Sequence, residues 1–167
     1  MGMTGTAATS PQRPHTLQDY REDPFMAIET VYTAEALATG DGRNGRTRTS
    51  DGMIDLNLST PAPMGGSGEG ANPEQLFAAG YAACFHGALR KIAAGEGADV
   101  SDSSVGAKVS IGKDDDGGFG LAVVIEVVIP HVDQAQAEAL AEKAHAFCPY
   151  SKATRGNIEV TVTVSDD

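Results

Sequence analysis

The first part of the chain alternates between apolar and polar residues at the period of short β-strands. Residues 28–37 contain enough β-branched and apolar side chains for one strand, and residues 46–50 and 53–58 alternate well enough for two more. Asp51-Gly52, between the last two, is a hairpin signal because these residue types accept the backbone angles of a two-residue turn. We therefore predict three N-terminal strands, the last two joined as a hairpin.

A long helix is predicted over residues 73–94. Asn72 is a favourable N-cap, Pro73 suits the first helical turn, and Gln75 occupies the position that completes a capping box. The stretch from Leu76 to Leu89 contains no Asp, Glu, Lys or Arg, so its apolar character extends around the whole helix. We therefore expect this helix to be buried nearly all round.

Two more strands, a second helix and a last strand are predicted in the C-terminal half. Residues 105–111 and 119–129 form a hairpin, and the second of these strands is so continuously apolar that it should be central in its sheet. Residues 134–147 show helical spacing and end shortly before a proline, which stops the helix. Residues 158–164 alternate strictly and form the last strand.

The predicted order is βββ-α-ββ-α-β, with more strands than helices and hairpins between neighbours, which indicates an α+β fold. The chain has 167 residues, about the length of one domain. Residues 1–25 are rich in Thr, Pro, Gln, Arg and Asp and show no periodicity. We therefore expect residues 1–25 to be a mobile tail and residues 26–167 to be a single domain.

Charge and composition disfavour several classes of partner. The formal net charge is −11, from 12 Lys and Arg against 23 Asp and Glu, so the field of the protein repels nucleic acid and anionic lipid. No apolar run approaches the ~20 residues that span a bilayer, and the sequence shows no secretory signal. The two cysteines fit a reducing cytoplasm better than a secreted scaffold held by disulfides.

Cys84 and Cys148 are the candidate reactive residues. Cys84 lies in the middle of the predicted long helix, where an inert core thiol is the ordinary alternative. Cys148 ends the second helix and is expected to be the more accessible of the two. Because they are 64 residues apart (148 − 84), the sequence leaves open whether they meet in space.

Arg43 and Glu74 are the candidate partners of a reactive thiol. A thiol peroxidase needs a cation that lowers the pKa of its cysteine and a second thiol that traps the sulfenic acid. Arg43, in the glycine-rich turn of residues 40–45, can supply the cation, and Glu74 can hold its guanidinium. The alternatives are a solvated loop arginine and a glutamate that pairs with the helix dipole. His86 lies two positions after Cys84 and faces elsewhere, so we interpret it as a core or surface histidine.

No metal site and no cofactor are predicted. The glycines of residues 65–68 lack the Lys and Ser or Thr of a phosphate-binding loop. Metal-ligand spacing is missing among the two cysteines and the four histidines, which are His15, His86, His131 and His145.

Two long segments resemble the organic hydroperoxide resistance proteins, which are the Ohr subgroup of the OsmC/Ohr family. Residues 72–85 (NPEQLFAAGYAACF) closely resemble the active-site helix, and residues 148–158 (CPYSKATRGNI) resemble the second cysteine motif. The resemblance covers residues 31–164. Shorter matching segments are residues 32–34, 42–46 and 117–121.

The resemblance implies an OsmC-like fold assembled as an intertwined homodimer, with central buried helices and two active sites at the interface. It implies that Cys84 is the peroxidatic cysteine and Cys148 the resolving cysteine. Arg43 matches the arginine that activates the thiolate, and Glu74 matches the glutamate that pairs with it. The turn before Arg43 has one extra residue compared with the family, which leaves Arg46 as the alternative.

The resemblance also implies organic and fatty-acid hydroperoxides as substrates, with dihydrolipoyl groups of lipoylated proteins or other dithiols as reductants. An apolar pocket would favour lipid-like substrates, since each buried CH₂ contributes roughly 0.8 kcal/mol. Two other interpretations stay open: a redox sensor that uses the same disulfide, and a carrier of apolar ligands in which the cysteines only pack. The candidate pocket residues are Met64, Phe77, Phe119 and Phe147.

Glu74 and Cys84 are ten positions apart on one predicted helix, which separates their backbones by about 15 Å. They are therefore not expected to share a pocket within one chain. Two antiparallel copies of the helix across a two-fold axis would bring Glu74 of one chain near Cys84 of the other. We therefore predict a composite site that needs both chains of a dimer.

Overall fold

The computed structural model describes residues 28–165. Contacts divide the chain after Ala34, and all helices and strands of the described residues belong to the unit that begins at Glu35. Residues 28–34 have no regular secondary structure, so the strand predicted over residues 28–37 is wrong for most of its length. The predicted tail, residues 1–25, and its boundary lie outside the described residues.

Three short antiparallel strands form the first sheet, in the order β1-β2-β3. They are β1 (Ala36–Thr39), β2 (Arg46–Thr49) and β3 (Asp55–Asn57). A 3₁₀ turn, η2 (Gly42–Asn44), interrupts the connection between β1 and β2, and a second one, η3 (Ala62–Met64), follows β3. The predicted hairpin at residues 51–52 is confirmed, because the N–H of Thr49 donates to the carbonyl of Ile54 at 2.9 Å across it.

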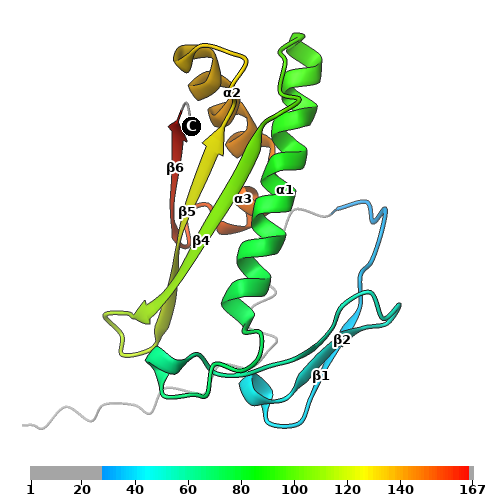
Figure 1. Ribbon diagram of the computed structural model, residues 1–167, viewed down its shortest axis with the longest axis vertical. Helices are drawn as coiled ribbons and strands as arrows, with labels where there is room; N and C mark the ends of the chain where they lie inside the picture. The colour runs from blue at the N-terminus through cyan, green and yellow to red at the C-terminus, as the bar shows by residue number, and fades with distance from the viewer. Residues whose placement is uncertain (1–27, 166–167) are drawn as a thin grey trace, which may run out of the picture. The chain divides into compact units, whose positions relative to one another are not determined.

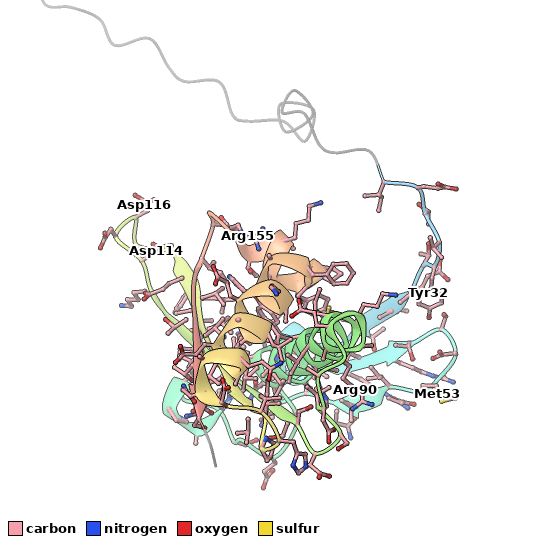
Figure 2. The ribbon with its side chains drawn as sticks, turned by 90° about the horizontal axis from the view of Figure 1, so that it is seen from above. Tyr32, Met53, Arg90, Asp114, Asp116 and Arg155 are labelled. Atoms are coloured by element: carbon pink, nitrogen blue, oxygen red, sulfur yellow. The ribbon has the colours of Figure 1, made fainter. Side chains whose placement is uncertain are left out.

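The second sheet has the order β4-β5-β6. Its strands are β4 (Ser104–Lys113), β5 (Phe119–Val128) and β6 (Glu159–Ser165). The central position predicted for β5 is confirmed, with β4 antiparallel on one side and β6 parallel on the other. Asp114 and Asp116 mark the tip of the β4–β5 hairpin (Figure 2).

Three helices accompany this second sheet: α1 (Pro73–Glu96), α2 (Gln134–Phe147) and α3 (Pro149–Thr154). Helix α1 packs on β4 and on α2, and α2 packs on β6, so the two long helices lie side by side against the sheet (Figure 1). The capping box predicted at Asn72 is present, since Asn72 Oδ1 accepts from Gln75 N and Gln75 Oε1 from Asn72 N. None of the described helices is long and apolar enough to cross a membrane.

Helix α3 was not predicted. Pro149 ends α2 as expected, but it also occupies the first turn of a new helix, where its missing N–H costs nothing. Cys148 is the single non-helical residue between the two helices, with φ −60° and ψ 126°. The observed order is therefore βββ-α-ββ-α-α-β.

The hydrophobic core lies between α1, α2 and β5. Its fully buried side chains each contribute about 1.5–3 kcal/mol relative to exposure. Every buried hydrophobic residue among the described ones lies between Tyr81 and Cys148, so β1, β2 and β3 contribute none. The largest of these core side chains are Tyr81, Phe85, Leu89, Val123, Ile125, Val127 and Leu140.

Burial of α1 nearly all round, which its composition predicts, does not occur within one chain. Ala79, Ala83 and Gly87 lie on an exposed face of the helix, while Tyr81 and Phe85 face the core. The spacing of the exposed residues, four positions each time, keeps them on one line along the helix. The described chain therefore presents an uncharged strip of small residues on its longest helix.

Replacing Asn72 with Ala should lower the free energy of unfolding by about 1 kcal/mol, because the N–H of Gln75 loses its acceptor at the start of α1. Urea denaturation followed by circular dichroism measures the change. Asn72→Asp keeps an acceptor oxygen and is the matched control, which should retain most of the stability. An equal loss in both variants would show that the capping oxygen is not the stabilising group.

Candidate active site

The two cysteines meet in space. Cys84 lies at the middle of α1, Cys148 lies at the break between α2 and α3, and their Sγ atoms are 3.6 Å apart. Both are free thiols. A disulfide bond is about 2.05 Å long, so the sulfurs would have to approach by roughly 1.5 Å to form one. Small rotations of the two side chains cover such a distance without moving a helix.

The exposure of the two thiols is the reverse of the prediction. Cys148 is fully buried, whereas Cys84 is only partly buried. Cys148 was expected to be accessible because it ends a helix, but α3 turns back over α1 and encloses it. Cys84 is therefore the thiol that a molecule from solution reaches first, and Cys148 lies behind it.

The surroundings of Cys84 within one chain do not favour the thiolate. Burial raises the pKa of the Cys84 thiol, and the neighbouring Cys148 raises it further. The backbone N–H of Tyr150 acts in the other direction and lowers this pKa. A reactive thiolate at Cys84 therefore needs a positive charge, and among the described residues of its own chain no cation shifts the pKa of Cys84.

Arg43 and Glu74 form the second pair of the candidate site. Gly40 and Gly42 adopt positive φ angles of 78° and 50°, which turn the chain so that Arg43 reaches α1. Nη1 of Arg43 donates to both carboxylate oxygens of Glu74 at 3.1 Å, and Nη2 also donates to Oε1. Arg46 instead pairs with Asp55 at 2.6 and 2.7 Å, so Arg43 is the arginine at Glu74.

The cysteine pair and the Arg43–Glu74 pair are separate within one chain. Glu74 is in the first turn of α1 and Cys84 is ten residues later, about 15 Å along the axis. Arg43 is not among the groups that shift the pKa of Cys84. The described residues of one chain therefore contain a thiol pair and an ion pair that do not meet.

An aromatic cluster borders Cys84. Tyr150 stacks on Phe77, with ring centroids 6.1 Å apart, and meets Tyr81 edge to face at 5.7 Å. The ring of Tyr150 lies so close to Gly80 that a Cβ there would be 3.2 Å from its hydroxyl oxygen. A side chain at this position, one helical turn before Cys84, would make a tight contact with the Tyr150 ring. The position of Tyr150 next to Cys148 was the available signal, but its role was not predicted.

The four candidate pocket residues do not gather in one place. Phe77 belongs to the aromatic cluster on α1 and is partly buried against the core. The other three are exposed and come from different elements: Met64 ends η3, Phe119 begins β5 and Phe147 ends α2. Phe147, for example, is 55% exposed.

A buried group of hydroxyls joins α1 to α3, the helix that follows the second cysteine, and sequence reasoning missed it. Tyr81 Oη is 3.0 Å from Ser151 Oγ and 3.1 Å from Thr154 Oγ1. His145 Nδ1 is 3.0 Å from the same Ser151 oxygen. The motif around Cys148 contains Ser151 and Thr154, but nothing in their sequence position indicates that they face a tyrosine of α1.

The described histidines are each bonded to a different residue. His86 Nε2 is 3.0 Å from Ser103 Oγ, and burial and the charge of Arg90 lower the pKa of His86. His131 pairs with Asp102 at 2.6 Å. Within residues 28–165, no three His, Cys, Asp or Glu side chains are placed to hold a metal ion together. His15 lies outside the described residues.

Comparison with known proteins decides the family. Residues 66–163 match the OsmC-like protein family. The organic hydroperoxide resistance protein of Xanthomonas axonopodis pv. citri (strain 306) is 50% identical over 139 residues, which are 82% of this chain and 96% of that protein. The chain belongs to the organic hydroperoxide resistance proteins of the OsmC family.

Solved structures of the same family agree in fold. A crystal structure from Elizabethkingia anophelis, with thiocyanate bound, is 46% identical, covers 84% of this chain and all of its own, and superposes with a TM-score of 0.80. OhrB of Bacillus subtilis is 44% identical, covers 81% of this chain and all of its own, and gives a TM-score of 0.74. The OsmC-like α+β fold predicted from the sequence is therefore confirmed.

Mild oxidation should join Cys84 and Cys148 within one chain, because their sulfurs are already 3.6 Å apart. Alkylation and non-reducing mass spectrometry measure the loss of both thiols and of two hydrogen atoms. Cys84→Ser and Cys148→Ser should each keep one alkylatable thiol and no internal cross-link. A wild-type protein whose two thiols both stay alkylatable after oxidation would contradict this geometry.

Proposed function

We propose that this chain is a thiol-dependent peroxidase that reduces organic hydroperoxides to alcohols. The observation that carries the proposal is the Cys84–Cys148 pair, with one partly exposed and one buried sulfur 3.6 Å apart. Such a pair suits an attacking thiol that meets substrate and a second, buried thiol that reacts with the sulfenic acid. Membership of the organic hydroperoxide resistance family supports the same activity.

Cys84 performs the first step. Its thiolate attacks the outer oxygen of the hydroperoxide, so that an S–O bond forms while the O–O bond breaks. Two electrons pass from sulfur to the peroxide, the inner oxygen takes a proton and leaves as the alcohol, and Cys84 becomes a sulfenic acid. A guanidinium beside the sulfur supports this step because it offsets the burial that raises the pKa of Cys84.

Cys148 performs the second step, and an external dithiol performs the third. The sulfur of Cys148 attacks the sulfenic sulfur, the S–S bond forms as the S–O bond breaks, and the oxygen leaves as water. A dihydrolipoyl group of a lipoylated protein, or another dithiol, then restores both thiols by exchange. The cycle needs no cofactor, and free thiols in the resting state suit a reducing cytoplasm.

Apolar residues near Cys84 would select lipid-like substrates. Phe77 and Tyr150 are already beside it in the aromatic cluster. Met64, Phe119 and Phe147 are exposed in one chain and complete such a pocket only if a second chain brings them to it. The partners that we propose are therefore an organic hydroperoxide, a dithiol reductant and a second copy of this chain.

Wild-type protein should reduce tert-butyl hydroperoxide repeatedly with dihydrolipoamide, whereas Cys84→Ser should lose turnover because the attacking sulfur is gone. Consumption of the hydroperoxide under steady-state conditions is the measurement. Cys148→Ser is the second variant and should reach the sulfenic acid without forming the internal disulfide. Stoichiometric consumption by wild type would favour a redox sensor instead. Binding of apolar ligand without any consumption would favour a carrier.

The homodimer is proposed from surfaces that one chain leaves uncovered. The β1-β2-β3 sheet has no buried hydrophobic residue, and Leu37, Ile54 and Leu56 on its strands and hairpin are exposed. A small sheet that buries no apolar face is not stable by itself. Helix α1 likewise leaves Ala79, Ala83 and Gly87 uncovered. A second copy of the chain can cover both surfaces at once.

The site itself gives the second reason for a dimer. Among the residues of one chain that the structure describes, no cation shifts the pKa of Cys84, and Arg43 is held by Glu74 about 15 Å away along α1. If two α1 helices pack antiparallel about a two-fold axis, the first turn of each helix can lie beside the middle of the other. Each Cys84 would then meet the Arg43–Glu74 pair of the other chain. We therefore propose two composite sites in each dimer.

Heterodimers of one Cys84→Ser chain and one Glu74→Ala chain should recover about one of the two sites, because a single composite site then contains both intact residues. Differently tagged chains, purified as the mixed dimer, are tested in the same steady-state assay. The matched controls are the two homodimers, each of which should have little activity. Mixed dimers no more active than these homodimers would contradict the composite site.

A further inference from the structure

We infer that the hydrogen-bonded chain Tyr81–Ser151–His145 is a positioning network for Cys148, which holds its sulfur ready to attack the sulfenic acid of Cys84. The inference rests on the proposed peroxidase function and assigns new roles to three residues within it. None of the three touches the reacting sulfurs through its polar group. Their effect is therefore expected on the second step of the cycle and not on the first.

Each residue of the network lies three positions from one of the two cysteines in the sequence. His145 lies three residues before Cys148 and Ser151 three residues after it, and their bond of 3.0 Å closes a ring around the break between α2 and α3. Tyr81 lies three residues before Cys84 on α1 and bonds Ser151 at 3.0 Å. The hydrogen-bonded network therefore joins α1 to the start of α3, as the sulfur pair does, about one helical turn away from the sulfurs.

The break at Cys148 is the point that needs to be held. Cys148 has extended backbone angles between two helices, and its N–H and carbonyl are bonded to Ala144 and Lys152, one in each helix. A single non-helical residue is a natural hinge between α2 and α3. The bond between His145 and Ser151 crosses this hinge from side to side and so fixes the angle between the helices.

The protons of the network can be placed consistently. The hydroxyl of Tyr81 donates to Ser151, and the Thr154 hydroxyl shares its one proton between Tyr81 Oη at 3.1 Å and the carbonyl of Tyr150 at 3.0 Å. Ser151 is then left with one proton, which it donates to Nδ1 of His145. This direction requires a neutral His145 with its proton on Nε2.

The surroundings of His145 favour that neutral form. Burial lowers the pKa of His145, and the charge of Arg155 lowers it further. Arg155 follows α3 directly and donates from Nη2 to the carbonyl of His145 at 2.9 Å (Figure 2). The end of α3 is therefore bonded to α2 through Arg155, in addition to the bond between Ser151 and His145.

Burial makes the loss of any one bond consequential. Tyr81 and Ser151 are fully buried, and Thr154 nearly so. A buried hydroxyl without a partner is costly, so the alternative to the present geometry is a rearrangement of α3 and not a simple gap. Rearrangement of α3 would move Cys148 away from the 3.6 Å contact, while Cys84 would keep its place on α1.

The two steps of the cycle respond differently to such a movement. The first step involves Cys84, the substrate and the cation that supports the thiolate, but not Cys148. The second step competes with further oxidation of the sulfenic acid to sulfinic acid by a second hydroperoxide, so it depends on how long Cys148 takes to reach Cys84. If the network only stabilised the fold, its loss would lower the rates of both steps in proportion to the folded fraction.

The test compares Ser151→Ala and Tyr81→Phe with wild type. Ser103→Ala is the matched control, because Ser103 is also a buried serine bonded to a histidine, at 3.0 Å from His86, but it lies outside the network. One equivalent of tert-butyl hydroperoxide is added in one series and several equivalents in a second, and acid quenching with thiol trapping and mass spectrometry follows thiol, sulfenic acid, disulfide and sulfinic acid at Cys84. Circular dichroism gives the folded fraction of each variant.

In both network variants, we expect loss of the Cys84 thiol at nearly the wild-type rate but formation of the disulfide about tenfold slower or more. Sulfinic acid at Cys84 should accumulate at hydroperoxide concentrations that leave wild type and Ser103→Ala in the disulfide form. Disulfide formation at the wild-type rate in folded Tyr81→Phe would overturn the inference. If Ser151→Ala does not fold, Tyr81→Phe decides, since it keeps the ring and removes only the hydroxyl.

Failure of the proposed function would look different. Wild type would then consume no hydroperoxide, and no variant could change that. The positioning role would still be measurable from the equilibrium of the Cys84–Cys148 disulfide with dithiothreitol, because the network sets how readily the two thiols meet. We expect this equilibrium to shift about tenfold toward the dithiol form in Tyr81→Phe but not in Ser103→Ala, and an unchanged equilibrium would overturn the inference.

Discussion

The packing of α3 against α1 is the contact on which the candidate site depends. It buries Cys148, leaves Cys84 partly open and sets the two sulfurs 3.6 Å apart. The close approach of Tyr150 to Gly80 and the bond between Tyr81 and Ser151 stabilise this contact on either side. Helix α3 has only six residues and is too short to be stable alone. Its orientation therefore depends on the aromatic rings and buried hydroxyls that it contacts.

Within one chain, the cysteine pair and the Arg43–Glu74 pair lie in differently packed parts of the described residues. The core between α1, α2 and β5 is closed and contains the cysteines, whereas the β1-β2-β3 sheet that carries Arg43 buries no apolar residue. The ion pair of Arg43 with Glu74 stays at the start of α1. We therefore regard dimerisation as the step that would bring the charge to the thiol, with folding of the core as a separate and earlier condition.

Local signals in the sequence predicted most of the fold correctly. The capping box at Asn72, the bounds of α2 and the central position of β5 follow from residue types within a few positions of each other. The meeting of Cys84 with Cys148 could not be predicted in this way, because it depends on contacts between elements 64 residues apart. Helix α3 was missed because a proline reads as a stop, and the burial of Cys148 was misjudged for the same reason.

The parallel pairing of β6 with β5 has a consequence for the order of folding. Parallel neighbours cannot be joined by a tight turn, and here the connection between them contains α2, Cys148 and α3. Cys148 is therefore carried on a crossover whose far end is anchored only when the last strand joins the sheet. A growing chain that emerges from the ribosome contains Cys84 before this anchoring is possible, so the two thiols are expected to come together late in folding.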